Sequence, residues 1–206
     1  MSTENPQTMA RYQAARRLML GCMILLICLL LVFSASDQSE LWHEQIEAYG
    51  LALMLIGIAG RLWSILYIDG HKSKSVVQTG PYSVTRNPLY FFSSVAALGV
   101  GAQTGSLVVA LACCIICIVS FHVVAMREER YLTAVLGAPY ADYLKRVPRF
   151  FPNPLIYRDQ ETVTFRPKIL NNTLLDGLVF FASIPFFEFI EVAQARHLIP
   201  VVFHVL

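Results

Sequence analysis

The chain has 206 residues, of which 56% are hydrophobic and 15% are charged, and its mean hydropathy is +0.55. Soluble domains carry roughly 25% charged residues, so this composition excludes an ordinary water-soluble domain and indicates a membrane protein. The formal net charge is only +2, and no Lys/Arg cluster lies among aromatic residues as a nucleic-acid-binding surface requires. We therefore expect a lipid bilayer around the protein and no nucleic-acid partner.

Five apolar segments predict an all-α, polytopic membrane protein with about five transmembrane helices. A bilayer core of roughly 30 Å needs about 20 helical residues, and the third segment, at about 22 Å, is short. Thr104 and Gly105 join it to the fourth segment, which predicts a helical hairpin. Residues 197–206 are too few to cross alone and are interpreted as interfacial or re-entrant. The five segments are 18–33 (extending to about 35), 46–68, 89–103, 106–126 and 174–192.

The basic residues predict the orientation of these helices. Arg11, Arg16 and Arg17 precede the first segment, a pattern shared with signal peptides, but no convincing cleavage site follows and we expect an uncleaved helix. Fourteen of the 16 Lys and Arg residues fall on one side if every segment crosses, whereas residues 34–45 hold three acidic residues and no basic one. The positive-inside rule then predicts a cytoplasmic N-terminus and an outward C-terminus.

The one long polar segment lies between the fourth and fifth apolar segments. The fourth helix is expected to continue to Leu136 and stop at Gly137, and Pro139 is expected to open a short helix that reaches Arg146. We find no internal repeat and no low-complexity linker, so residues 1–206 are interpreted as a single membrane-embedded domain.

Arg86, Asn87 and Pro88 stand at the start of the third apolar segment. Asn is a strong helix N-cap and Pro a favoured first helical residue, so the three residues can simply start a helix. The same geometry suits an anion, because a helix N-terminus offers unpaired N–H groups and a neighbouring Arg binds a carboxylate through two hydrogen bonds. The sequence leaves both interpretations open.

Two adjacent carboxylates, Glu128 and Glu129, follow the fourth apolar segment. They can pair with Arg127 and Arg130 on a solvated face, or one of them can bind an ammonium group on a ligand. On a helix they point about 100° apart, so they do not project equally into one pocket. Glu129 shares its face with His122, which is either an interhelical donor or a member of the same site.

Two further features have both a structural and a functional interpretation, and a third has only a structural one. Arg61 lies inside the second segment, where an ionisable residue is a functional candidate by default. Gly99 and Gly101 allow a ligand or another helix to approach closely, and glycine is common in membrane helices for packing alone. Glu188 and Glu191 lie near the outer end of the fifth segment and are interpreted as structural.

The cysteines give no indication of a metal site. All five lie in apolar runs, where Cys behaves as a small hydrophobic residue. Cys113 and Cys117 share a helix face, but no His or Asp joins them as a ligand. The sequence therefore predicts no metal centre.

Taken together, these motifs resemble the isoprenylcysteine carboxyl methyltransferase family, to which the phospholipid N-methyltransferases are related. The order and spacing of the motifs carry the resemblance, and the chain has Asn87 where the family usually has His. The motifs are Arg61-Leu62-Trp63, Gly80-Pro81-Tyr82, Arg86-Asn87-Pro88-Leu89-Tyr90, Glu128-Glu129, Tyr140-x-x-Tyr143 and Arg146-Val147-Pro148-Arg149-Phe150-Phe151-Pro152.

The resemblance implies S-adenosylmethionine in a cytoplasm-facing pocket formed by the third and fourth segments and the amphipathic segment after them. It assigns residues 57–152 to the methyltransferase-like core and leaves 174–206 as an additional C-terminal membrane segment. Arg86 and Arg61 would be catalytic. The residues expected to bind the cofactor are Tyr82, Asn87, Pro88, Tyr90, Gly99, Gly101, His122, Glu128, Glu129 and Tyr143.

The expected reaction is methyl transfer to a lipophilic acceptor that enters from the bilayer, with carboxyl O-methylation as the leading hypothesis. A carboxylate is already nucleophilic, whereas an amine must first lose a proton. Phospholipid N-methylation is the alternative within the class, and a small non-enzymatic transporter or scaffold is the alternative outside it. A transporter should place polar groups across the midplane, whereas most ionisable residues here gather at the predicted cytoplasmic ends.

Overall fold

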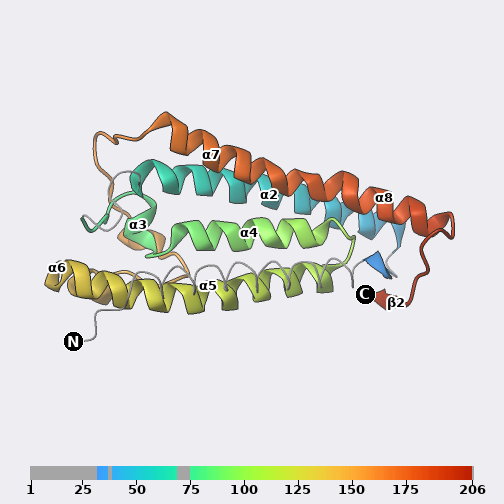
Figure 1. The fold of residues 1–206 in the computed structure, drawn as a ribbon, viewed down its shortest axis with the longest axis horizontal. Coiled ribbons are helices and arrows are strands. Elements are labelled where there is room, and N and C mark those ends of the chain that lie inside the picture. The colour runs from blue at the N-terminus through green and yellow to red at the C-terminus, as the bar shows by residue number, and fades with distance from the viewer. Residues whose placement is uncertain (1–31, 37–38, 69–74, 206) are drawn as a thin grey trace, which may run out of the picture.

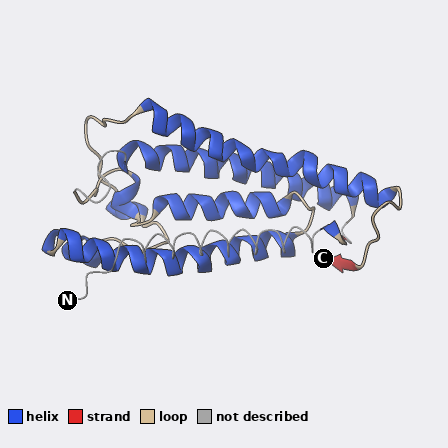
Figure 2. Cartoon of the chain, in the orientation of Figure 1, coloured by secondary structure: helices blue, strands red, loops and turns tan. Residues whose placement is uncertain are grey.

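The computed structural model describes residues 32–36, 39–68 and 75–205. Most of the predicted first transmembrane segment, 18–33, therefore lies outside the described residues. Helices are the main secondary structure of the described chain, which also contains two three-residue strands and connecting loops (Figure 2). The helices are α2 (Glu40–Ile68), α3 (Pro81–Val84), α4 (Pro88–Ala102), α5 (Leu107–Leu136), α6 (Ala138–Arg146), α7 (Pro167–Leu178) and α8 (Ser183–Ala195), with short 3₁₀ turns η1 (Pro154–Ile156) and η2 (Val179–Ala182).

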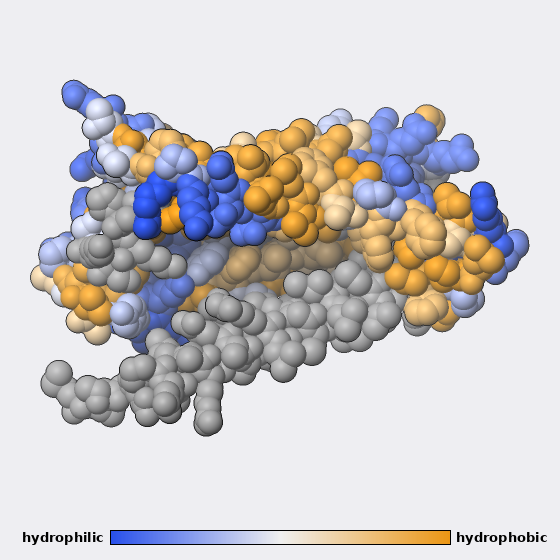
Figure 3. Space-filling view, turned by 45° about the horizontal axis from the view of Figure 1, so that its top comes forward, coloured by the Kyte–Doolittle hydropathy of each residue, from blue (hydrophilic) through white to orange (hydrophobic). Residues whose placement is uncertain are grey.

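The long helices lie side by side in one elongated bundle (Figure 1). α4 packs between α2 and α5, and α7 packs on α2. Three helical stretches are long and apolar enough to cross a membrane, namely Glu40–Ile68, Leu107–Leu136 and Pro167–Ala195, and α4 is a shorter apolar helix. Hydrophobic side chains cover much of the middle of the bundle, with hydrophilic ones towards its two ends (Figure 3). The prediction of an all-α membrane protein is confirmed, while the number of crossings stays a prediction.

Small residues set the distance between α2 and α4. A Cβ added to Gly57 would lie 2.8 Å from the backbone nitrogen of Ala96, and one added to Gly99 would lie 2.5 Å from the carbonyl oxygen of Gly50. The two backbones are therefore in direct contact, as is usual where membrane helices pack through glycine and alanine. This contact holds the short α4 in the centre of the bundle.

The hairpin between α4 and α5 forms where the sequence predicts it. Gly105 has a φ of +62°, a conformation that glycine adopts without strain, and Ser106 caps α5 by accepting a hydrogen bond from the backbone N–H of Val109. At its other end α5 stops at Gly137, which has a φ of +65°. α6 begins there and carries Pro139 in its first turn. The predicted boundaries of both helices are confirmed.

The C-terminal part differs from the prediction in two respects. The fifth apolar segment is longer than 174–192, because α7, η2 and α8 run on from one another from Pro167 to Ala195. The tail is not without regular structure, since β2 (Phe203–Val205) pairs in parallel with β1 (Ser34–Ser36), and its interfacial position stays a prediction. Three-residue strands carry no periodicity that a sequence pattern can reveal, so this pairing depends on tertiary contacts.

Candidate functional site

Two segments far apart in the sequence lie side by side at the end of the bundle where α3 and α6 lie. The first joins α3 to α4, and the second follows α6 and is called the return segment (residues 147–153). The backbone N–H of Arg86 donates to the carbonyl of Pro148 at 2.9 Å, and that of Asn153 donates to Val84 at 2.9 Å. The buried hydroxyl of Thr85 donates to the carbonyl of Phe150 at 2.9 Å. These bonds place the return segment over the start of α4.

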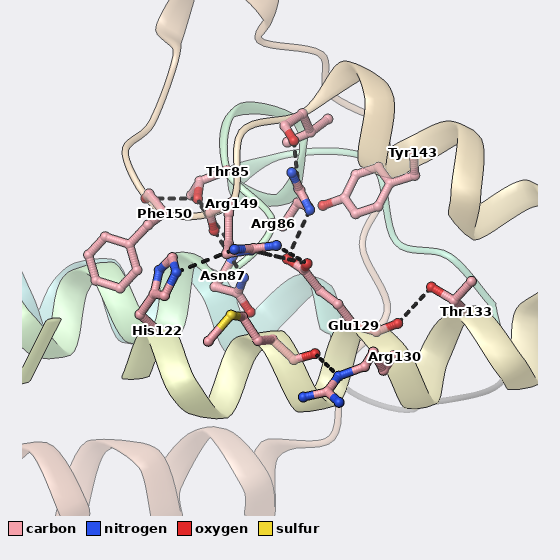
Figure 4. Close-up of polar contacts among 12 residues, drawn as sticks. Thr85, Arg86, Asn87, His122, Glu129, Arg130, Thr133, Tyr143, Arg149 and Phe150 are labelled. Atoms are coloured by element: carbon pink, nitrogen blue, oxygen red, sulfur yellow. Dashed lines mark hydrogen bonds and ion pairs between the residues drawn. The ribbon is translucent and has the colours of Figure 1, made fainter. Parts of the chain in front are cut away.

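Arg86, Glu129 and Arg149 form a cluster of one carboxylate and two guanidinium groups, called the Arg–Glu–Arg cluster (Figure 4). Arg86 Nη1 donates to Glu129 Oε1 at 2.9 Å. Arg149 donates from the Nε–Nη2 edge of its guanidinium group. Its Nη2 donates to Glu129 Oε2 at 2.9 Å, and its Nε lies 3.1 Å from both carboxylate oxygens. Only 8% of the Glu129 side chain is exposed. The cluster therefore joins α5 to the start of α4 and to the return segment.

The cluster has an excess of positive charge. Two guanidinium groups share the single carboxylate of Glu129, which leaves about one unit of positive charge at a largely buried position. Arg149 is the more accessible of the two, with 34% of its side chain exposed, and its Nη1 lies 3.3 Å from Nε2 of His122. An anionic group that reaches Arg149 would be attracted by this charge.

Asn87 has a different role from the one that the sequence indicates. Its side chain makes no capping hydrogen bond to α4. Instead its amide Nδ2 donates to the carbonyl of Arg149 at 2.9 Å, and the Thr85 hydroxyl accepts from the Asn87 backbone N–H. Pro88 begins α4 as predicted. Asn87 thus fixes the return segment, and the expected side-chain cap is wrong.

Glu128 and Tyr90 form a second polar contact beside the cluster. The Tyr90 hydroxyl donates to Glu128 Oε2 at 2.8 Å, and the Tyr90 ring stacks on Phe121 with 4.7 Å between ring centroids. Among the described residues Tyr90 is the hydrogen-bond partner of Glu128, and the other carboxylate oxygen makes no hydrogen bond to them. The two adjacent glutamates therefore differ, because Glu129 is taken up by arginines and Glu128 is not.

Tyr82 provides a buried hydroxyl without a partner. Its residue is 5% exposed, and its Oη has no hydrogen-bond partner in the described chain. Burial raises the pKa of Tyr82 well above 10, and the neighbouring Tyr143, Tyr90 and Glu128 raise it further. The hydroxyl is therefore a neutral donor. Tyr143 holds this part of the chain in place by donating from its own hydroxyl to the carbonyl of Tyr82 at 2.8 Å.

Arg61 lies deeper in the bundle. Its Nη1 donates to the hydroxyl of Ser93 on α4, and its guanidinium carbon stands 5.8 Å from the centroid of the Phe180 ring. Its Nε is buried and has no hydrogen-bond partner among the described residues. Ser93 is six residues after Asn87, which corresponds to about 9 Å along the axis of α4. Arg61 is thus separate from the Arg–Glu–Arg cluster.

The predicted site residues fall into three groups. One group lies at the α3–α6 end of the bundle and contains Tyr82, Arg86, Asn87, Pro88, Tyr90, His122, Glu128, Glu129 and Tyr143. Arg61 stands apart from them. Gly99 and Gly101 belong to the helix contacts instead, since a Cβ at Gly101 would lie 2.8 Å from the Cα of Ala110 on α5.

Sequence reasoning missed Arg149 as a site residue. It was visible only as one position of a basic and aromatic motif after α6, and nothing in that motif indicates a partner 20 residues earlier. Glu129 was expected to pair either with its neighbours Arg127 and Arg130 or with a ligand. In the structure Arg130 donates to its own helix at the carbonyl of Met126, and the arginines of other segments reach Glu129.

Comparisons with known proteins give one matching family model and two similar proteins. A family model described as phospholipid methyltransferase matches residues 16–138. Over 134 residues the chain is 34% identical to the cobalt-zinc-cadmium resistance protein CzcN of Cupriavidus metallidurans, a match that covers 63% of this chain and 62% of the relative. Over 178 residues it is 30% identical to the nickel-cobalt-cadmium resistance protein NccN of Alcaligenes xylosoxydans xylosoxydans, covering 84% and 82% respectively. No solved structure matches significantly.

Proposed function

This chain belongs to the phospholipid methyltransferase family, and we propose on that premise that it transfers a methyl group from S-adenosylmethionine to a lipophilic acceptor. Family members generally use this cofactor. The observation that carries the proposal is the group of polar side chains around Glu128 and the Arg–Glu–Arg cluster, which offers separate partners for an ammonium and a carboxylate. S-adenosylmethionine carries both groups at one end.

The residues at this end of the bundle fit the cofactor. The buried Tyr82 hydroxyl has no partner among the described residues, and such a group costs about 1–3 kcal/mol unless something accepts from it. Glu128 has a carboxylate oxygen for an ammonium or for ribose hydroxyls. The surplus positive charge of Arg86 and Arg149 suits a carboxylate. His122 and Asn87 hold Arg149 and its carbonyl in position, so they support the site through Arg149.

When bound, the cofactor would supply a methyl group on a positively charged sulfur. The acceptor would attack the methyl carbon in line, and the sulfur would leave as a neutral thioether. The protein's part in such a reaction is to position the reactants and exclude water. The Tyr90 ring, held flat against Phe121 and by its bond to Glu128, offers an aromatic face to the cation. The return segment, tied down by Thr85 and Asn87, covers the site from the water side.

Arg61 supports an anionic acceptor. Its charge stands inside a membrane helix, its Nε has no hydrogen-bond partner in the described part of the chain, and a carboxylate or phosphate on a lipid would satisfy that donor. We propose that Arg61 holds the acceptor, about 9 Å along α4 from the cluster. A carboxylate acceptor and the phosphate of a phospholipid both fit this role, so Arg61 is compatible with either acceptor class. Replacing Arg61 by Gln should raise the KM for the acceptor and leave the affinity for S-adenosylmethionine unchanged.

Calorimetry with S-adenosylmethionine on purified protein in detergent tests the cofactor site. Glu128→Gln should weaken binding roughly ten- to a hundredfold, which corresponds to about 1.5–3 kcal/mol for a hydrogen bond to a charged group. The matched control is Glu44→Gln, which removes an exposed carboxylate at the other end of the bundle. Normal binding by Glu128→Gln would remove this residue from the site, and no binding by the wild-type protein would overturn the proposed activity.

The chemistry of the product separates the two acceptor classes. Membranes labelled with methyl-tritiated cofactor should release volatile methanol on treatment with base if the product is a methyl ester. An N-methylated lipid would keep its label under the same treatment. If all of the label stays in the lipid fraction, the carboxyl O-methylation hypothesis is wrong and phospholipid N-methylation takes its place.

The charge pattern supports a multi-pass protein with its N-terminus and cofactor site in the cytoplasm. The Arg–Glu–Arg cluster and the α3–α6 end would then face the cytoplasmic pool of the cofactor. The acceptor would enter sideways from the bilayer. A non-enzymatic transporter or scaffold is the rival from another class, and the calorimetric experiment separates it from the enzyme.

The names of the two relatives favour a physiological setting. Both are called resistance proteins for divalent metals, and we propose that methyl transfer by this chain contributes to tolerance of such metals. A metal-sensitive host should regain growth on cobalt or zinc with the wild-type gene and not with Glu128→Gln at equal membrane abundance. If Glu128→Gln restores growth as well as the wild-type gene does, metal tolerance does not depend on methyl transfer by this chain.

A further inference from the structure

A second group of ionisable side chains lies at the opposite end of the bundle, where α2 begins and α8 ends (Figure 1). His43 and Glu47 stand one helical turn apart on α2, and Glu191 faces them from α8. Nε2 of His43 is 3.3 Å from Glu47 Oε1 and 3.1 Å from Glu191 Oε1. The three potential ligand atoms all lie within 4.8 Å of one another. None of these residues takes part in the site proposed above.

The turn between α4 and α5 fixes the ring of His43. A Cβ added to Gly105 would lie 2.0 Å from Nδ1 of His43, so the imidazole packs directly on the glycine. The positive φ of Gly105 independently favours glycine there. With Nδ1 against the turn, Nε2 is directed at the two carboxylates. Histidines that bind metals are usually oriented by a hydrogen bond from the other ring nitrogen, and here packing on the turn restricts the ring.

The three ligand types suit a divalent transition-metal ion. One imidazole nitrogen and two carboxylate oxygens are ligands that Zn²⁺, Co²⁺ and Ni²⁺ accept. Ligand atoms about 2.1 Å from a tetrahedral ion stand about 3.4 Å apart, close to the two separations from His43 Nε2. The side chains of His43, Glu47 and Glu191 are 23%, 33% and 44% exposed, so water can complete the coordination.

The local charge also favours a cation. Glu188 precedes Glu191 by one turn on α8, and its charge acts on Glu47. Glu188 therefore adds negative charge beside the two carboxylates that contact His43, and the mutual repulsion of these carboxylates would be offset by a divalent ion. The exposed Trp42 and Tyr49 flank the group on α2, as aromatic residues do at the boundary between membrane and water. An ion could reach this level from the aqueous side.

We propose that His43, Glu47 and Glu191 form a binding site for a divalent transition-metal ion. Nε2 of His43 would coordinate the metal through its lone pair, which requires that this nitrogen carry no proton. Protons compete for the same nitrogen, so affinity falls as the pH is lowered. The sequence analysis predicted no metal centre and a structural role for Glu191. A pattern along the chain could not reveal this site, because its ligands are almost 150 residues apart.

Calorimetry with Zn²⁺ alone, and the visible absorption of Co²⁺, test the proposal on the tag-free full-length protein in detergent. We expect one ion per chain. Glu191→Gln and His43→Gln should each lower the affinity at least tenfold. Glu44→Gln is the matched control, since it removes an exposed carboxylate next to His43 that does not belong to the group, and it should bind metal as the wild type does.

Two results would overturn the metal site. Unchanged affinity in both Glu191→Gln and His43→Gln would reduce the group to a hydrogen-bonded contact between α2 and α8. Intense charge-transfer absorption of Co²⁺ would place the ion on thiolates, of which Cys113, Cys114 and Cys117 are the described candidates. Glu191 is the most exposed of the three ligands, so Glu191→Gln keeps the test decisive if His43→Gln does not fold. Neither measurement involves methyl transfer.

Discussion

At the scale of single residues, Glu128 and Glu129 are adjacent in sequence and differ in environment. Glu129 is 6% exposed and bound by two arginines from segments on either side of it in the sequence. Glu128 is partly exposed and bound by the hydroxyl of Tyr90. Their side chains point about 100° apart around α5. Glu129 therefore contacts the two arginines, whereas Glu128 keeps one carboxylate oxygen without a hydrogen-bond partner among the described residues.

Replacing each glutamate by Gln should separate these roles in the unliganded protein. Glu129→Gln leaves Arg86 and Arg149 without their carboxylate, and the unfolding free energy should fall by about 3 kcal/mol, the lower end for a broken buried ion pair because Arg149 is partly exposed. Glu128→Gln keeps an acceptor for Tyr90 and should change stability by less than about 0.5 kcal/mol. Thermal unfolding in detergent measures both, and equal losses of stability would contradict this division.

At the scale of elements, the short helix α4 carries the site because its two ends are fixed differently. Its beginning is held by the return segment through Asn87 and Arg86. Its end is held by direct backbone contact between Gly99 and Gly50 of α2. The structure shows Gly99 in helix packing, which sets the position of everything that α4 presents, while the predicted cofactor role of Gly99 stays a prediction.

Gly99→Ala tests this packing. The added Cβ would lie 2.5 Å from the Gly50 carbonyl oxygen, and overpacking of this kind typically costs about 1–3 kcal/mol. The Tm should fall while the affinity of the folded protein for S-adenosylmethionine stays within about twofold of wild type, since the contact lies roughly 18 Å along α4 from Asn87. A selective loss of cofactor affinity with unchanged Tm would restore Gly99 to the ligand site.

At the scale of the whole molecule, the two ends of the bundle carry different chemistry. The α3–α6 end has basic residues, the Arg–Glu–Arg cluster and a return segment that covers it. The other end has the acidic group around His43, the α4–α5 turn and the strand pair. Apolar surface separates the two ends on the face seen in Figure 3, which is the distribution expected of a bundle that spans a membrane.

Cysteine probes test the orientation of the bundle. Single cysteines at Ser39, beside the start of α2, and at Thr164, before α7, stand at opposite ends of the molecule. In a background without the native cysteines, a membrane-impermeant maleimide should label Ser39→Cys from outside intact cells and Thr164→Cys only after the membrane is opened. Labelling of both from the same side would contradict the orientation and the cytoplasmic access of the cofactor site.

The sequence by itself determined the membrane class, the family, the hairpin at Thr104 and Gly105, and the helix boundary at Gly137. These depend on local composition and on residues such as glycine whose backbone preferences act within a few positions. Only the tertiary structure decided that Glu129 is held by Arg86 and Arg149, that Asn87 ties the return segment, and that His43 meets Glu191. These pairs join residues 20 to almost 150 positions apart, and their contacts follow from how the helices pack rather than from any pattern along the chain.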